Sequence, residues 1–285
     1  MSDAATGGAD TPLDVLIPTF ERPAALASPL TSLLAQTPAA LRVVVSDQSR
    51  RAASFDAPEV MAPVRVLRAQ GREVELHRHL PRRGLAEQRQ FLLDRVSAPG
   101  CLFIDDDVIL EPDLIERLWR TIREEGCGLV GCGLIGLSFL DDVRPHEQAV
   151  ELWEGPVEPE LVTPGSREWE RYKLHNAANL HHVARRLGLA PGARVRYKLA
   201  WAGGCVLYDT GALRDAGGFE FWEELPALHA GEDVLAQLRV MARRGGCGIL
   251  PSGAYHQELP TTIAERAVDA PWVLPVVTEA ARASS

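Results

Sequence analysis

The sequence predicts an α/β fold, with a mostly parallel central sheet and helices on both of its faces. Apolar runs of strand length alternate with helical patterns throughout the first half of the chain. Two of these runs, residues 13–17 and 41–45, end in polar loops, as strands do at the ligand-binding edge of an open α/β sheet. A third run, residues 101–104, ends in three consecutive acids.

The composition narrows the class of protein. With 285 residues, 46% of them hydrophobic and 24% charged, the chain can bury a sizeable core in one large or two small domains. The net charge of -9 argues against general nucleic-acid binding, which leaves a basic footprint. One basic stretch could still meet phosphates or anionic lipid, although most such stretches are solvated faces. Its arginines are Arg65, Arg68, Arg72, Arg78, Arg82 and Arg83.

The sequence also bears on the compartment. No apolar run reaches the roughly 20 residues that a bilayer requires, and residues 1–11 lack the apolar core of a secretion signal. We therefore expect a cytoplasmic protein without a transmembrane segment. The five cysteines form no CxxC pair, which favours reduced and mostly buried thiols.

The first elements follow a leader, residues 1–12, that we expect to be disordered. The strand over residues 13–17 ends in turn chemistry, and a leucine-rich helix follows, although Pro29 fits only if that helix begins near it. The strand over residues 41–45 comes next, and residues 64–67 predict a third strand.

A helix that opens at Gly84 precedes the acidic strand, with Leu85, Leu92 and Val96 on its inner face. After the acids, a well-marked helix begins at Glu111-Pro112-Asp113, where proline and acids favour an N-terminus. Gly126 ends this helix.

The three acids Asp105, Asp106 and Asp107 are the strongest chemical signal in the chain. Neighbouring carboxylates repel one another and are costly to bury, which suggests a counter-cation at the end of the strand. Carboxylate oxygens are the ligands that Mg²⁺ or Mn²⁺ prefers. The alternative is a solvated acidic turn.

The middle of the chain, residues 134–196, is the least patterned part. Residues 172–187 look helical, and the histidines in that stretch could be ligands. Ordinary surface or core histidines are the commoner explanation, because no second cluster at ligand spacing accompanies them. These histidines are His175, His181 and His182.

Regular patterns return in the last third. Residues 199–208 predict a strand interrupted by Gly203 and Gly204, where a ligand or another backbone approaches closely or the strand bulges. Gly231-Glu232-Asp233 starts a helix, and acids there would on their own be explained by the helix dipole. A strand over residues 247–250 leads to His256, and the apolar residues between 272 and 277 could pack back on the core or touch a membrane surface.

Taken together, these pieces resemble the family 2 inverting glycosyltransferases of GT-A fold, over residues 13–256. The fold implied is a Rossmann-like GT-A sheet. The order and spacing of the matching stretches carry the resemblance. They are Val15-Leu16-Ile17-Pro18-Thr19-Phe20 with Arg22-Pro23, Val44-Val45-Ser46-Asp47, Gly84-Leu85-Ala86-Glu87-Gln88-Arg89-Gln90, Phe103-Ile104-Asp105-Asp106-Asp107, Gly203-Gly204 with Gly217-Gly218-Phe219, and Gly231-Glu232-Asp233.

The resemblance implies a nucleotide crevice lined by Pro18, Thr19 and Glu21. Asp47 would accept a hydrogen bond from the base, as the acid after the second strand does in this family. Arg83 would lie near the phosphates, although the basic stretch that contains it is longer here than in the family pattern.

The acids receive roles in the same way. Asp105 and Asp107 match the DxD motif, so that Asp105 would touch the ribose or metal-bound water and Asp107 would hold Mn²⁺ or Mg²⁺ against the diphosphate. Asp106 would lie on the nucleotide side, and His256 falls where some GT-A enzymes place another metal ligand. Glu232 and Asp233 match the ED pair, with Asp233 as the catalytic base.

Two departures from the family pattern matter. The usual Ala-Arg-Asn appears as Gln88-Arg89-Gln90, which keeps the arginine and replaces the asparagine by a longer amide. The Gln-x-x-Arg-Trp motif of processive members is absent, which disfavours a polymerising synthase. The resemblance divides the chain into a nucleotide-sugar half, residues 13–133, an acceptor half of the same domain, residues 134–258, and a tail, residues 259–285.

The leading hypothesis is therefore a metal-dependent inverting transferase, of hexosyltransferase type, that moves a sugar from a nucleotide-diphosphate donor, most simply a UDP-sugar, to an acceptor hydroxyl. A nucleotide-sugar-binding module without catalysis is the first alternative. A phosphohydrolase of the haloacid dehalogenase type is weaker, because its nucleophilic acid belongs in the first strand. A nucleotidyltransferase would open with a glycine-rich phosphate loop, and residues 18–23 contain no glycine.

Overall fold

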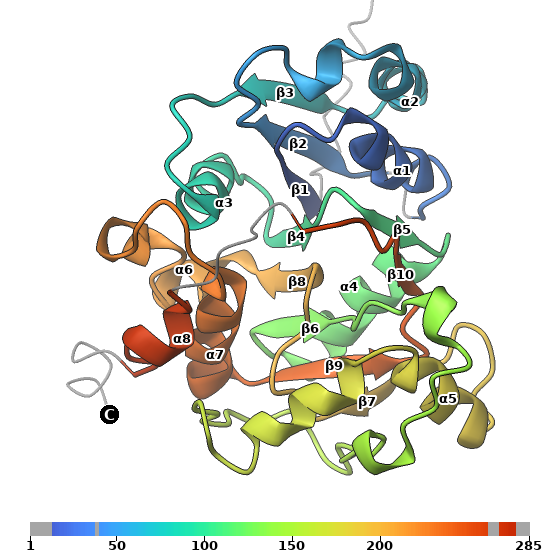
Figure 1. Ribbon diagram of the computed structural model, residues 1–285. Helices are drawn as coiled ribbons and strands as arrows, with labels where there is room; N and C mark the ends of the chain where they lie inside the picture. Colours follow the sequence, from blue (N-terminus) through green and yellow to red (C-terminus); the bar gives the residue numbers. More distant parts are fainter. Residues whose placement is uncertain (1–12, 38–39, 262–267, 278–285) are drawn as a thin grey trace, which may run out of the picture.

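One sheet of eight strands runs through the protein in the order β3-β2-β1-β4-β8-β6-β9-β7 (Figure 1). The structure is a computed structural model and describes residues 13–37, 40–261 and 268–277. The strands of this sheet are β1 (Leu13–Thr19), β2 (Arg42–Asp47), β3 (Val74–Arg78), β4 (Gly100–Ile104), β6 (Leu129–Gly131), β7 (Val195–Tyr197), β8 (Cys205–Asp209) and β9 (Gly246–Leu250). A separate antiparallel pair is formed by β5 (Val108–Leu110) and β10 (Ala254–His256).

The sheet is mostly parallel, as predicted. β3, β2, β1 and β4 run parallel to one another, and β6 runs parallel to β9. β8 is antiparallel to both β4 and β6, and β7 is antiparallel to β9. β8 therefore joins the parallel first half of the sheet to the second half, and the sheet is continuous across both.

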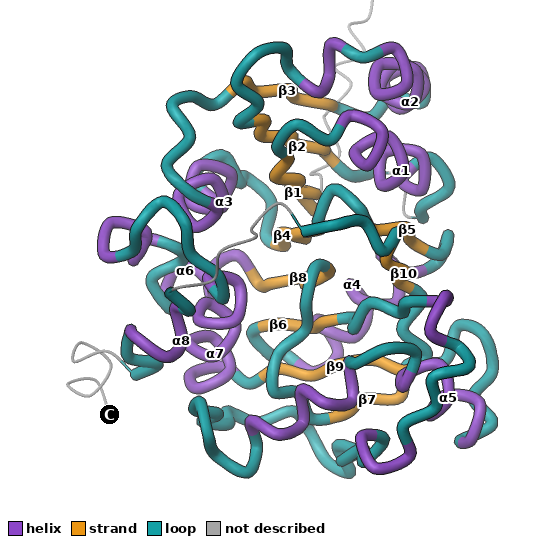
Figure 2. Tube along the Cα trace, viewed as in Figure 1, coloured by secondary structure: helices purple, strands orange, loops and turns teal. Residues whose placement is uncertain are grey.

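Helices cover both faces of the sheet, again as predicted (Figure 2). The helices are α1 (Pro23–Leu33), α2 (Pro58–Ala69), α3 (Leu85–Leu93), α4 (Leu114–Glu125), α5 (Asn179–Arg186), α6 (Thr210–Asp215), α7 (Glu232–Arg244) and α8 (Ala270–Val273). Shorter 3₁₀ turns are η1 (Ser54–Asp56), η2 (Leu137–Phe139), η3 (Pro145–Glu147), η4 (Trp169–His175) and η5 (Glu220–Glu224).

Two apolar cores lie on opposite faces of the sheet, because successive strand residues point to opposite sides. In β1, Val15 and Ile17 belong to the core under α1, α2 and α4, whereas Leu16 belongs to the core under α3, α6 and α7. All seven residues of β1 are buried. This burial on both faces explains why the strand is a continuous apolar run rather than an alternating one.

The third strand was placed wrongly from the sequence. Residues 64–67 lie in α2, and the strand is β3, Val74–Arg78. Pro58 starts the helix, and Val60, Val64 and Leu67 recur at helical spacing and are fully buried. β3 reads Val-Glu-Leu-His-Arg, and its polar residues concealed it within the basic stretch.

Three other boundaries differ from the prediction. α1 begins at Pro23 and keeps Pro29 inside it. The helix expected over residues 172–187 is divided into η4 and α5, between which Ala177 has a positive φ of 50°. The strand expected from residue 199 begins only at Cys205, and the glycines before it belong to a loop.

Further predictions concern the cysteines, the tail, membrane-spanning segments and the leader. The five cysteines are free and buried, as expected. In the tail, Val276 is buried, whereas Trp272 and Val273 are exposed. No helix in the described part of the chain has the length and apolar character needed to cross a bilayer. The leader, residues 1–12, lies outside the described residues.

Candidate active site

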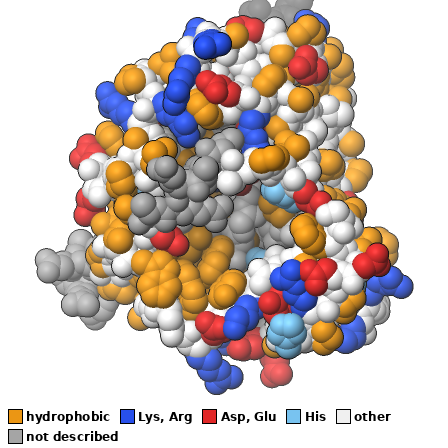
Figure 3. All heavy atoms as spheres, viewed as in Figure 1, with side chains coloured by type: hydrophobic (Ala, Val, Ile, Leu, Met, Phe, Trp, Pro, Cys, Tyr) orange, Lys and Arg blue, Asp and Glu red, His pale blue; other side chains and the backbone are white. Residues whose placement is uncertain are grey.

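The candidate site is a cavity of about 540 Å³ on the side of the sheet where β1, β2 and β4 end. It is lined by the segments after these strands, by α3, by the start of α7 and by the tail. The surface is hollowed at the centre of Figure 3, between the half of the molecule that contains β1–β3 and the half that contains β6–β9. The cavity brings together residues from both halves of the chain.

The end of β1 contributes Pro18 and Thr19, as predicted from the sequence. The Thr19 hydroxyl donates to Asp106 Oδ2 across 2.6 Å. Glu21 is exposed and has a positive φ of 54°, and its backbone N–H donates to Ser49 Oγ. Glu21 is not among the residues that line the cavity, so its predicted contact with a nucleotide stays a prediction.

Asp47 at the end of β2 is fully buried. Its carboxylate accepts the backbone N–H groups of Ser49, across 2.7 Å, and of Ser54. The neighbouring side chain, Gln48, lines the cavity in its place. Asp47 therefore shapes the loop after β2, and its predicted hydrogen bond to a base remains a prediction.

The basic stretch contributes Arg82 to the lining of the cavity, and the predicted place of Arg83 near the phosphates stays a prediction. Arg83 is exposed and lies over the ring of Trp222. Arg82 lines the cavity, and its guanidinium lies 3.8 Å from the ring centroid of Phe20. The sequence named both arginines in one basic cluster, but no pattern distinguished the one that reaches the cavity.

Two of the acids after β4, Asp106 and Asp107, have different environments. Asp106 accepts Thr19 Oγ1 and Arg22, and its burial raises its pKa to about 6. The buried Asp107 lies 3.0 Å from Arg22 and 3.4 Å from His256 Nε2. Burial alone would raise the pKa of Asp107, but the hydrogen bond and charge of His256 and the charge of Arg22 outweigh it and lower the pKa.

Arg22 is a site residue to which the sequence gave no role, although it belongs to the matched Arg22-Pro23 pair. Its guanidinium is salt-bridged to both Asp106 and Asp107 and donates to the carbonyl of Pro260. Arg22 therefore holds three elements together: the loop after β1, the acidic loop after β4 and the start of the tail.

Asp107 and His256 form the pair of side chains with donor atoms suited to a divalent metal. The strand pair β5–β10 brings them together, because His256 lies opposite Val108 in the register. Across residues 13–37, 40–261 and 268–277, no group of three or more His, Cys, Asp or Glu side chains could hold a metal ion by itself. His175, which the sequence left open, is half-buried with its Nε2 2.9 Å from the Tyr197 hydroxyl, and desolvation lowers its pKa to about 4.

Arg89 on α3 connects the acidic loop to the start of α7. Its guanidinium donates to Asp105 across 2.8 Å and to Glu232 across 3.1 Å. Burial alone would lower the pKa of Arg89, but the charges of the two carboxylates outweigh it and raise the pKa. Three polar side chains of α3, Glu87, Gln88 and Arg89, are buried.

The start of α7 presents Glu232 and Asp233 to the cavity. Burial raises the pKa of Glu232, and burial together with the charge of Glu232 raises the pKa of Asp233 to about 7. A carboxyl group with a pKa near neutrality is suited to accept a proton from a substrate. The predicted ED pair therefore lies on the same cavity as the predicted DxD acids.

His229 fixes the loop before α7 against α3. Its Nε2 accepts the backbone N–H of Ala86 across 3.1 Å, and its Nδ1–H donates to the carbonyl of Pro226. A Cβ at Gly84 would lie 2.7 Å from the His229 ring. Glycine at position 84, just before α3, therefore permits the close contact between α3 and the loop before α7.

Two tryptophans also line the cavity, Trp169 from η4 and Trp201 from the loop before β8. Trp169 belongs to the least patterned part of the sequence, residues 134–196, and Trp201 lies just beyond it in the stretch predicted as a strand; the sequence gave neither a role. Gly204 follows Trp201 closely in the chain, and its carbonyl accepts the backbone N–H of Asp105 across 3.0 Å. Gly204 thus permits a close approach of the kind considered from the sequence, since a Cβ there would lie 2.6 Å from Leu134 and 3.0 Å from Asp105, whereas a Cβ at Gly203 would meet nothing within 4 Å.

A comparison of the sequence with models of protein families found a match. A family model described as glycosyl transferase family 2 matches residues 14–175, which is more than half of the chain. No curated protein sequence is significantly similar to the chain.

Solved structures share the fold. The crystal structure of S. aureus TarS superimposes with a TM-score of 0.54 at 17% identity, over 86% of this chain and 36% of TarS. The structure of S. aureus TarS 1-349 in complex with UDP-GlcNAc gives a TM-score of 0.54 at 16% identity, over 88% of this chain and 60% of that one. The present chain thus spans less than two thirds of the length of these proteins.

Proposed function

Since the chain belongs to the family 2 glycosyltransferases, we propose that it transfers a sugar from a nucleotide-diphosphate donor to an acceptor hydroxyl, with inversion of the anomeric centre and with the help of a divalent metal. The observation that carries the proposal is the bridge that Arg89 makes between Asp105 and Glu232. Because Asp233 follows Glu232 directly, this bridge holds the segment with the proposed base close to the acidic loop, and both line the same cavity.

The proposed metal binding rests on the side chains that could act as ligands of the ion. Asp107 and His256 would hold Mn²⁺ or Mg²⁺, and their carboxylate oxygen and imidazole nitrogen suit such ions. Ions of this kind keep several water ligands and are often bound through one or two carboxylates plus substrate phosphates. The residues present therefore fit a metal that is completed by the donor's diphosphate. When bound, it would offset the negative charge of the departing diphosphate.

Asp233 is the proposed base. An acceptor hydroxyl is a weak nucleophile at neutral pH, and Asp233 would take its proton while its oxygen attacks the anomeric carbon and the bond to the phosphate breaks. General base catalysis of this kind contributes about a hundredfold to ten-thousandfold. A single displacement with one base inverts the anomeric centre.

The nucleotide would occupy the crevice of Pro18, Thr19, Gln48 and Arg82, which line the wall of the cavity near the end of β1. UDP is the first nucleotide to test, since a protein of the same fold has been solved with UDP-GlcNAc. Because that likeness is one of fold alone, the donor should be identified by comparing nucleotides directly.

The experiment needs no acceptor. Thermal unfolding is measured with UDP, GDP, CDP and dTDP, each with and without Mn²⁺, because a ligand of the native state raises apparent stability by RT ln(1 + [L]/Kd). Hydrolysis of the matching nucleotide sugar is then measured with wild type and Asp233→Asn. We expect a metal-linked shift with one nucleotide in both proteins and hydrolysis only in wild type.

Two results would contradict the proposal. Normal turnover by Asp233→Asn would refute the base assignment. A metal-linked shift without any turnover of the nucleotide sugar, even in wild type with acceptors supplied, would favour the non-catalytic binding module.

A further inference from the structure

Every acid of the loop after β4 has a cationic partner within the protein. Asp105 accepts a hydrogen bond from Arg89 across 2.8 Å, and Arg22 contacts Asp106 Oδ1 at 2.9 Å and Asp107 Oδ2 at 3.0 Å. Three neighbouring carboxylates suggest a counter-cation, because their charges repel one another. In the structure the chain itself supplies that counter-cation.

Arg22 and His256 meet at the same carboxylate oxygen. His256 Nε2 lies 3.4 Å from Asp107 Oδ2, the atom that Arg22 also contacts. Neighbouring ligands of an octahedral Mg²⁺ lie about 3 Å apart, because each is about 2.1 Å from the ion. The spacing of Asp107 and His256 is close to that of two ligands of one ion. Such an ion would have to share its oxygen ligand with the guanidinium of Arg22.

Arg22 therefore competes with a divalent ion for Asp107. The side chains of Arg22 and Asp107 are 17% and 8% exposed, so that water and salt screen their interaction poorly. An ion on Asp107 Oδ2 would lie close to the guanidinium, and two like charges at short range repel strongly. Binding of the ion thus requires that Arg22 give up its pair with Asp107.

A nucleotide diphosphate would offer Arg22 another partner. Arg22 lines the same cavity as Thr19, Gln48 and Arg82, which form part of the proposed nucleotide crevice. The diphosphate brings several negative charges into this cavity, and guanidinium groups bind phosphate oxygens through parallel hydrogen bonds. The charge of Arg22 is then compensated even when Asp107 binds the ion.

We propose that Arg22 is the internal counter-cation of the metal site. It pairs with Asp107 while no donor is bound, and it transfers to the donor's diphosphate when Asp107 binds the divalent ion. Arg22 thereby couples the two ligands: each binds weakly without the other, since only together do they satisfy both Asp107 and Arg22. This inference rests on the proposed function, because it assumes that a divalent ion and a nucleotide diphosphate share the cavity.

The acidic loop has anchors that do not involve Arg22. Thr19 Oγ1 donates to Asp106 Oδ2 across 2.6 Å, and the backbone N–H of Gln257 donates to the carbonyl of Asp107 across 2.9 Å. The side-chain amide of Gln257 donates to the carbonyl of Ala25 across 3.1 Å. Replacement of Arg22 should therefore leave the loop in place, so that the effect of its charge can be measured.

The test measures Mn²⁺ binding rather than sugar transfer. Free Mn²⁺ is followed by its electron paramagnetic resonance signal while the full chain is titrated, alone and with UDP, GDP, CDP or dTDP. The Mn²⁺ that each nucleotide binds in solution is subtracted. The variants are Arg22→Gln, which removes the charge, and Arg22→Lys, which keeps it. If Arg22→Gln does not fold, Arg22→Gln/Asp106→Asn is compared with Asp106→Asn, because the pair of changes removes one charge of each sign.

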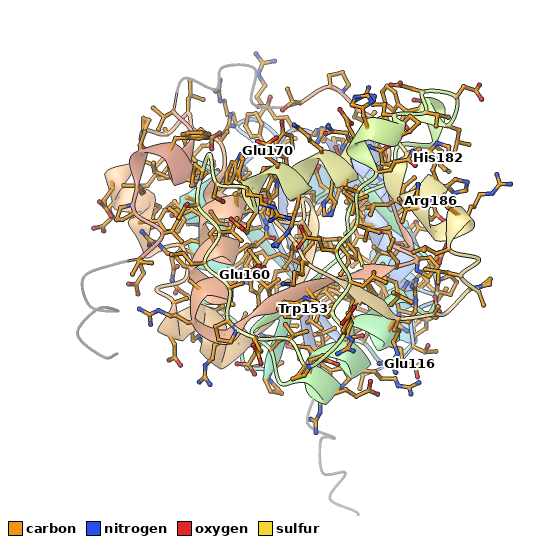
Figure 4. All side chains as sticks on the ribbon, turned by 90° about the horizontal axis from the view of Figure 1, so that it is seen from below. Glu116, Trp153, Glu160, Glu170, His182 and Arg186 are labelled. Atoms are coloured by element: carbon orange, nitrogen blue, oxygen red, sulfur yellow. The ribbon has the colours of Figure 1, made fainter. Side chains whose placement is uncertain are left out.

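Two other arginines serve as controls for the loss of a positive charge. Arg82 lines the cavity and lies over the ring of Phe20, but the salt bridges to the acids belong to Arg22. Arg186 on α5 donates to Gln148 and is not among the lining residues of the cavity (Figure 4). Without nucleotide, Arg186→Gln should bind Mn²⁺ as wild type does, and Arg82→Gln should stay much closer to wild type than Arg22→Gln.

Without nucleotide, Arg22→Gln should bind Mn²⁺ about tenfold more tightly than wild type, because the competing cation is gone. Arg22→Lys should stay close to wild type, and the double variant should bind more tightly than Asp106→Asn. The matching nucleotide should strengthen Mn²⁺ binding by about tenfold in wild type and clearly less in Arg22→Gln.

Weaker or unchanged Mn²⁺ binding by nucleotide-free Arg22→Gln would overturn the inference, since removal of a residue that only supports the loop weakens the site. Equal tightening in Arg82→Gln would also overturn it. The same titrations separate the two proposals. Nucleotide-dependent Mn²⁺ binding that Arg22→Gln does not alter refutes the role of Arg22 alone, whereas no Mn²⁺ binding by any of these proteins, with or without nucleotide, refutes the metal of the proposed function as well.

Discussion

The guanidinium of Arg89 donates to the carboxylate of Glu232 across 3.1 Å, although 143 positions separate the two residues in the chain. Both side chains are buried, at 4% and 3% exposure. The same guanidinium reaches Asp105. One cation thus neutralises two acids from distant segments, and removing it leaves their charges without compensation.

The first prediction concerns this bridge. Arg89→Met should destabilise the protein by about 3–5 kcal/mol, because an unpaired buried charge costs more than the pair itself contributes. Urea unfolding measures the loss. The double variant Arg89→Met/Glu232→Gln should recover part of it, since the uncompensated charge on α7 is then gone. A double variant as unstable as the single one would show that the charges are not the cause.

The second prediction concerns pH. Asp233 must be ionised to act as a base, and its pKa is raised to about 7 by burial and by the charge of Glu232. The rate of sugar transfer should therefore rise with pH and level off above about 7. Glu232→Gln removes the neighbouring negative charge, so its residual activity should reach the plateau at lower pH. A profile that does not move in Glu232→Gln would exclude this coupling.

The third prediction concerns the metal. Chelation with EDTA should remove the Mn²⁺-linked part of the nucleotide's thermal shift, and Asp107→Asn should have the same effect. Asp106→Asn is the matched control, since its amide oxygen can still accept the Thr19 hydroxyl. It should retain the metal-linked shift. Equal losses in both variants would mean that Asp107 has no special part in holding the ion.

The fourth prediction compares two glycines with positive φ. A Cβ at Gly231, which has a φ of 75°, would lie 2.1 Å from Asp269 Oδ1 and 2.7 Å from Pro271. Gly188 has a φ of 63°, and a Cβ there would meet nothing within 4 Å. Gly188→Ala should cost about 1 kcal/mol of unfolding free energy from its backbone alone. Gly231→Ala should cost clearly more, and equal costs in urea unfolding would refute the steric argument.

Much of this architecture could be predicted, because in several segments the residue types, the length of the apolar run and the residues at its ends all indicate the same element. β1 and β4 are apolar runs of strand length that end in polar residues, and α4 begins after Pro112 and its N-cap Asp113 and ends at Gly126, which has the left-handed conformation. The Glu232-Asp233 pair begins α7, as the sequence indicated.

The failures have physical causes. Residues 64–67 are too short a stretch to distinguish a buried helix from a strand. The helical spacing of Val60, Val64 and Leu67 identifies the helix only when a longer window is considered. The roles of Arg22 and Arg89 depend on partners 84 and 143 residues away. No local pattern contains such pairings, and the tryptophan pair is concealed for the same reason.

The long separation between Arg89 and Glu232 also has a consequence for how the chain acquires its structure during synthesis. The strands β3, β2, β1 and β4 are complete once residue 104 has been made, and their parallel pairing requires nothing downstream. Arg89, however, gains its partner on α7 only after residue 232. Contacts of such high sequence separation form late and slowly. The donor crevice should therefore take shape first on the ribosome, and catalytic competence should be the last property that the nascent chain gains.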